Sequence, residues 1–101
     1  MKHETYGALG RRNYKLEELD KIFAQAREIF VAKNNDYGNE NVSALGERAV
    51  FVRAFDKICR LKQLVWHEKN AMVKDEKVED TYLDLLNYCA IAIIIRRGRW
   101  K

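Results

Sequence analysis

Proline is absent from the chain and glycine is rare: the 101 residues contain no proline and five glycines. So few turn-forming residues are typical of long helices joined by short connections. The longest apolar run, CAIAIII at residues 89–95, is far shorter than the roughly 20 residues that a membrane-spanning helix needs. The N-terminal segment lacks the apolar stretch of a signal peptide. These absences predict a cytoplasmic protein without a membrane partner.

Cysteine is also rare, with Cys59 and Cys89 as the only two. Each lies in apolar helical surroundings, so we predict two reduced core residues rather than a disulfide. A hydrophobic share of 48% and a charged share of 34% exclude the composition of a disordered chain. The length predicts a single domain, residues 1–101. The net charge of +4 suits a partner that carries phosphates, either a nucleotide or a nucleic acid.

Apolar residues recur at helical spacing in three segments: 16–33, from 43–46 to 68, and 76–97. Asn13 and Asp75 are the predicted N-terminal caps of the first and third helices, and Gly98 marks the end of the third. Residues 1–12 are expected to form an arm that is mobile or bound to a partner. The positions predicted to face the core are Leu16, Leu19, Phe23, Ala26 and Phe30, then Phe51, Ala54, Phe55, Ile58, Leu61, Leu64 and Val65, then Val78, Tyr82, Leu85, Leu86, Cys89, Ala92 and Ile93.

The predicted fold is therefore all-α, a small antiparallel bundle of three main helices with no strand. The third helix is apolar nearly all round towards its end, and such a helix must be covered on more than one side. Three helices alone do this poorly, so we expect a homodimer or larger homo-oligomer to complete the bundle.

Charged residues on the second and third helices do not fit a plain bundle. On the second helix, Arg53, Asp56 and Arg60 share a face, with Lys57 one step round. One interpretation is an intrahelical ladder of ion pairs, each contributing a few tenths of a kcal/mol. On the third helix, Asp80 and Asp84 lie one turn apart, and like charges at this spacing repel.

A bound cation is the alternative interpretation of these charges. Carboxylates that converge from two antiparallel helices repel one another unless a cation neutralises them. Mg²⁺ prefers oxygen ligands and commonly bridges to substrate phosphates. Arg53, Lys57 or Arg60 could then contact the phosphates.

The loop KNNDYG, residues 33–38, permits two interpretations as well. It could simply end the first helix, because Asn and Gly favour turns. It could also face a nucleotide, with Lys33 supplying charge, Asp36 a carboxylate and Tyr37 a stacking surface.

Taken in order, KNNDYG at 33–38, VRAFDKICRLKQL at 52–64 and VEDTYLDLLNYCAIA at 78–92 resemble the first of the phage nucleotide-modification-associated domain families. These are small helical proteins of phages and some bacteria. The family in turn resembles the all-α nucleoside triphosphate pyrophosphatases of the MazG-like group, in which acidic residues on two adjacent helices hold magnesium. The resemblance implies a role in phage nucleotide metabolism, in the host bacterial cytoplasm.

Matched residue by residue, the resemblance implies that Asp56, Asp80 and Asp84 are catalytic and hold Mg²⁺, with Glu79 as a further acid of the motif. The chain departs from the pyrophosphatase pattern at two points. Asp56 stands where several glutamates are usual, and the acids of the third helix are spaced i, i+4 instead of i, i+3, with Thr81 at the other site. Fewer ligands imply weaker metal retention. The residues expected to bind substrate are Lys33, Asp36, Tyr37, Arg53, Lys57, Arg60 and Asn87.

Three functions follow as hypotheses. The first is Mg²⁺-dependent hydrolysis of a (deoxy)nucleoside triphosphate or modified nucleotide to a monophosphate and pyrophosphate. The second is a module that binds or sequesters a nucleotide without turnover, as a phage accessory or anti-defence protein. The third is nucleic-acid binding through the basic tail RRGRWK, residues 96–101, where Trp100 could stack on a base. In the alternative interpretation of the tail, its cations complement the helix dipole and Trp100 packs against another subunit.

Overall fold

Three helices make up the structure, a computed structural model that describes residues 13–34, 44–68 and 74–101, with only the backbone described at 74–77. They are α2 (Tyr14–Ala32), α4 (Glu47–Leu61) and α5 (Lys74–Arg96), and α4 runs on into a π-helical turn, η2 (Lys62–Trp66). Within the described residues there is no strand. The predicted all-α fold is confirmed, and the predicted helices match the observed ones except for shifts of a few residues at their ends.

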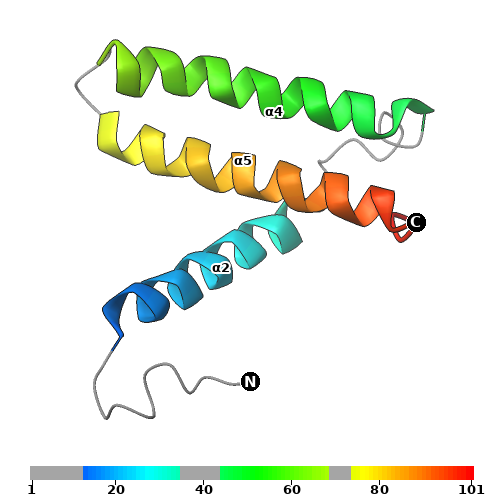
Figure 1. Ribbon diagram of the computed structural model, residues 1–101, viewed down its shortest axis with the longest axis horizontal. Helices are drawn as coiled ribbons and strands as arrows, with labels where there is room; N and C mark the ends of the chain where they lie inside the picture. Colours follow the sequence, from blue (N-terminus) through cyan, green and yellow to red (C-terminus); the bar gives the residue numbers. More distant parts are fainter. Residues whose placement is uncertain (1–12, 35–43, 69–73) are drawn as a thin grey trace.

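The central helix of the arrangement is α5 (Figure 1). It runs antiparallel to α4 along its length, and α2 packs against another side of it. The described part of the chain contains no helix with the length and apolarity needed to cross a membrane. Because α5 contacts both other helices, polar residues of α5 can interact with side chains of α2 and of α4.

Two of the three predicted helix ends have the expected chemistry. The Asn13 side chain accepts a hydrogen bond from the backbone N–H of Leu16 at 3.1 Å, which caps α2. Gly98 has a φ of 68°, and its N–H donates to the carbonyl of Ile95 at 2.9 Å. This left-handed glycine is the usual end of an α-helix. By contrast, α5 begins at Lys74, so Asp75 falls inside the helix instead of capping it.

The core of the single chain is small. Val50 of α4 and Ile91 of α5 are each 1% exposed, and partly buried side chains of α2, α5 and the C-terminal tail pack against them. Much of the predicted core face is exposed instead. The prediction is wrong for Leu19, Phe23, Phe51, Phe55, Ile58, Val65, Tyr82 and Ile93.

Both cysteines are free and exposed, so the predicted absence of a disulfide agrees with the structure and their predicted burial is wrong. Cys59 lies on the side of α4 turned away from α5, because Val50 and Leu61 mark the opposite side at helical spacing.

Candidate functional site

Three charged side chains meet where the end of α2 comes close to the middle of α4 and α5. Lys33 follows the last residue of α2, Lys57 lies in α4 and Asp84 in α5. The Nζ atom of Lys33 is 3.5 Å from Asp84 Oδ1, and the Nζ atom of Lys57 is 3.4 Å from Asp84 Oδ2. Each carboxylate oxygen therefore has its own lysine, and two positive charges face one negative charge. We call these three residues the lysine–aspartate cluster.

Helical spacing explains why Lys57 and Asp84 point towards each other. Lys57 comes two turns after the buried Val50 and one turn before the buried Leu61, so it shares the face of α4 that packs on α5. Asp84 comes one turn after the buried Thr81 and two turns before Ile91, on the corresponding face of α5. The periodicity that builds the core thus carries a lysine and an aspartate into the interface between the helices.

Solvent exposure limits how much the cluster stabilises the fold. The side chains of Lys33, Lys57 and Asp84 are 50%, 27% and 22% exposed. Ion pairs with this much solvent around them contribute at most about 1 kcal/mol each. The cluster is therefore open enough to exchange its internal ion pairs for contacts with a charged ligand.

The remaining charges on α4 do not form the predicted ladder. Arg53 is half-buried, while Asp56 and Arg60 are exposed. Among the described residues, no salt bridge joins Asp56 to either arginine. Arg53, Lys57 and Arg60 follow one another at i, i+4 and i+7, so they place positive charge along one side of α4.

The three predicted magnesium ligands, Asp56, Asp80 and Asp84, are not gathered into one cluster in the described structure. Asp80 and Asp56 are exposed, and the carboxylate of Asp84 is already paired with two lysines. Among the side chains that the structure describes, those of residues 13–34, 44–68 and 78–101, no three Asp, Glu, His or Cys residues come close enough together to hold a metal ion. Asp36 and Tyr37 lie outside the described residues. The assignment of Mg²⁺ to Asp56, Asp80 and Asp84 stays a prediction from the sequence.

Asn87, predicted to contact substrate, has a contact inside the fold. It is 4% exposed, and its Nδ2 donates a hydrogen bond to the backbone carbonyl of Ala26 at 3.0 Å. This bond joins α5 to α2 at the position where Ala26 is itself buried. Asn87 therefore holds the two helices together and sets the position of α2.

The substitution Asn87→Ala should lower the free energy of unfolding by about 1–3 kcal/mol, because it removes a buried hydrogen bond between helices. Urea unfolding followed by circular dichroism measures this loss. Gln25→Ala removes an exposed amide from α2 and should change stability by less than about 0.5 kcal/mol. Equal effects of the two substitutions would contradict a structural role for Asn87.

The basic tail is partly engaged within the chain. Arg96 Nε lies 3.0 Å from Glu47 Oε2 of α4. The ring of Trp100 packs edge-on against Phe30 of α2, with ring centroids 6.3 Å apart. Trp100 thus packs within its own chain. Its ring is only partly available to a nucleobase.

Sequence reasoning missed the pairing of Asp84 with both lysines. The signal was available for Lys57, because opposite charges occupy core-facing positions of two adjacent helices. Lys33 could not be assigned in this way, because its approach depends on the angle at which α2 crosses α5.

The fold and the lysine–aspartate cluster define a small helical protein with a positively charged site at the junction of its helices. The chain belongs to the family described as Nucleotide modification associated domain 1, whose model matches residues 33–95, more than half of the chain. The match begins at Lys33 and extends almost to the end of α5, so it includes the whole cluster. No curated protein and no solved structure matches the chain.

Proposed function

We propose that this chain binds a nucleotide through its phosphates, with Lys33 and Lys57 as the groups that contact them. The observation that carries the proposal is the convergence of these two lysines, from separate helices, on the single carboxylate of Asp84. A phosphate group offers several oxygens in place of the two that Asp84 supplies, and charge-assisted hydrogen bonds to it are strong. The family description, which refers to nucleotide modification, agrees with a ligand of this class.

The surroundings of the lysine–aspartate cluster favour an anion over a cation. Arg53 and Arg60 extend the positive charge of Lys57 along α4, and the chain carries a net charge of +4. Positive potential of this kind attracts a polyanion and speeds its association. A bare metal ion would instead be repelled by the two lysines unless it arrived already bound to phosphate.

The MazG-like resemblance predicts more than binding: it predicts hydrolysis of the nucleotide to a monophosphate and pyrophosphate. That reaction uses carboxylate-bound metal to polarise the phosphate and activate water. Since the described carboxylates do not form such a set, binding without turnover is the function that the geometry supports best. A module of this kind would hold or deliver a nucleotide for a separate modifying enzyme.

Isothermal titration with deoxynucleoside triphosphates, inorganic triphosphate and nucleosides tests the proposal. The two phosphate-bearing ligands should bind and the nucleosides should not. Lys57→Gln should weaken binding about tenfold, because a charged hydrogen bond to phosphate contributes on the order of 1.5 kcal/mol at a partly exposed site. Lys21→Gln, which removes an exposed lysine of α2, is the control and should leave the affinity unchanged.

The same mixtures, assayed for pyrophosphate with and without Mg²⁺, separate binding from turnover. Binding without pyrophosphate release would support the module that we propose. Mg²⁺-dependent release that is lost in Asp84→Asn would support the hydrolase instead. An affinity that is unaffected by Lys57→Gln would exclude the cluster as the phosphate site.

A further inference from the structure

One face of the α4–α5 pair is apolar, and α2 packs mainly on α5, which leaves the α4 part of this face open. Three exposed apolar residues of α4 follow at i, i+4 and i+7, and two of α5 lie at i and i+11, so each set lies on one side of its helix. The rings of Phe51 and Phe55 stack with centroids 6.4 Å apart. We call this surface the apolar face; its exposed members are Phe51, Phe55, Ile58, Val65, Trp66, Tyr82 and Ile93.

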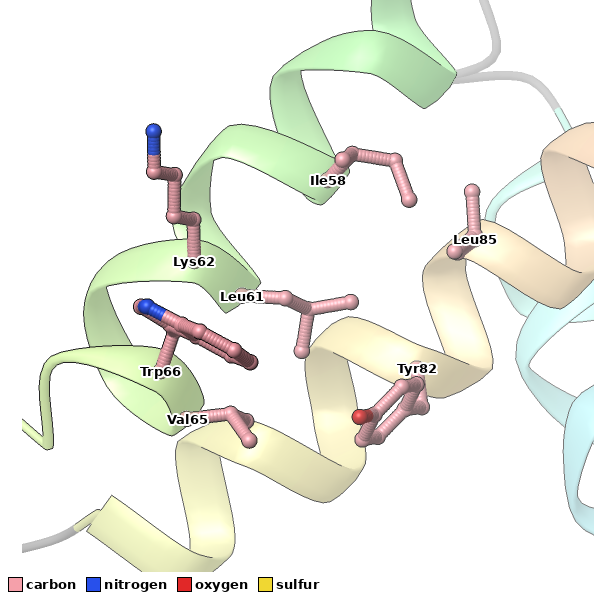
Figure 2. Close-up of a pocket in the computed structure, with 7 residues that line it drawn as sticks. All are labelled: Ile58, Leu61, Lys62, Val65, Trp66, Tyr82 and Leu85. Carbon is pink, nitrogen blue, oxygen red and sulfur yellow. The ribbon is translucent and has the colours of Figure 1, made fainter.

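A groove hollows the apolar face at one end, with a volume of about 500 Å³ (Figure 2). Leu61 lies in the groove, with Val65 and Trp66 on one side and Tyr82 on the other. The groove coincides with the π-helical turn η2. A π turn is wider than an α turn and shifts the side chains that follow it round the helix. Trp66, at the end of this turn, is 78% exposed.

At its other end the apolar face is bordered by charged side chains. Glu47 and Arg96 pair at 3.0 Å across α4 and α5, and both lie with Arg48 beside Phe51. The members of the face itself carry no charge, so the contact that it offers is apolar. A surface of this kind is suited to a copy of itself, because an isologous contact brings the same patch together from both sides.

The area of the apolar face agrees with the requirements of a dimer. Its four aromatic side chains are between 50% and 78% exposed, which corresponds to roughly 400–600 Å² at 150–250 Å² per ring system. Ile58, Val65 and Ile93 are each about half exposed and bring the total towards the ~800 Å² per partner of a standard interface. The small core of the single chain gives the same indication, since a short helical chain often needs association to bury enough apolar surface.

We propose that the apolar face binds a second copy of this chain, so that two α4–α5 pairs form a four-helix bundle. In such a bundle each helix pair covers the other's stripe, and the grooves beside Trp66 are filled from the partner. The lysine–aspartate cluster lies on the interface of α4 with α5 and the end of α2, so it stays outside the contact between copies. This proposal does not depend on nucleotide binding.

Sedimentation equilibrium at micromolar concentration tests the proposal. The unaltered protein should have twice the 11.9 kDa mass of one chain. Phe51→Glu places a charge within the contact and should raise the dimer dissociation constant by about a hundredfold. Phe23→Glu is the matched control, because Phe23 is similarly exposed but lies on α2, and this variant should remain a dimer. A single-chain mass for the unaltered protein, or a dimer that survives Phe51→Glu, would overturn the proposal.

Cysteine labelling supplies a test that needs no substitution. Cys89 lies on α5 between Tyr82 and Ile93, on the side that the second copy would cover, and it is exposed in the single chain. In the dimer a thiol reagent should label Cys89 at least tenfold more slowly than after dilution below the dissociation constant. A labelling rate of Cys89 that does not depend on protein concentration would refute the proposed contact.

Discussion

Ile91→Ala is expected to lower the free energy of unfolding by about 3 kcal/mol, within the 2–5 kcal/mol typical of such core substitutions. Ile91 is 1% exposed, and it packs on Val50 of α4 at the place where Phe30 of α2 and Trp100 of the tail also converge. Removing three carbon atoms there leaves a cavity among these packed side chains. For a domain of this length, whose total stability is roughly 5–15 kcal/mol, the loss is large.

Urea unfolding at a fixed protein concentration measures the change, and the concentration matters because association adds to stability. Ile22→Ala is the matched control: it removes the same atoms from a position on α2 that is 39% exposed. Its effect should stay below about 1 kcal/mol. If the two variants unfold at the same urea concentration, Ile91 is not the centre of the core.

The helices could be predicted because their signals are local. Apolar spacing, Asn13 as a cap and Gly98 as a stop are all read from a few neighbouring residues, and the structure places each of them as expected. Burial could not be predicted in the same way. A stripe such as that of Phe51 and Phe55 shows that a helix has an apolar side, but which element covers that side depends on how the helices are arranged.

The sequence indicated which charged residues belong to the candidate site, but it did not indicate which of them contact one another. Spacing could have placed Lys57 and Asp84 on facing sides of two helices, where they do meet, but this pairing was missed. The three acids Asp56, Asp80 and Asp84 were also grouped, yet no three metal-ligating side chains among the described residues come close enough to hold a metal ion. Asn87 was expected to contact substrate. It donates a hydrogen bond to the backbone carbonyl of Ala26. Every residue has such a carbonyl, so the sequence does not indicate this partner.

The double substitution Lys33→Gln/Lys57→Gln should weaken nucleotide binding about a hundredfold. It removes both cations and leaves Asp84 unpaired, so the cluster changes from one excess positive charge to one negative charge. A unit charge about 4 Å from a phosphate contributes between about 1 kcal/mol in water and 4 kcal/mol near a protein surface. Two such losses of about 1.4 kcal/mol each correspond to the hundredfold change. Isothermal titration with inorganic triphosphate measures it, and Lys21→Gln is again the control.

Asp84→Asn gives the opposite result if Asp84 is the internal counterion of the two lysines. Without its charge, Lys33 and Lys57 no longer have a competing anion, and triphosphate should bind about tenfold more tightly in the absence of magnesium. If Asp84 is instead a magnesium ligand, the same variant should bind the magnesium complex of the nucleotide more weakly and should change little in the presence of a chelator. The direction of the change therefore separates the two roles: tighter binding without metal assigns Asp84 to the lysines, and weaker binding only with metal assigns it to magnesium.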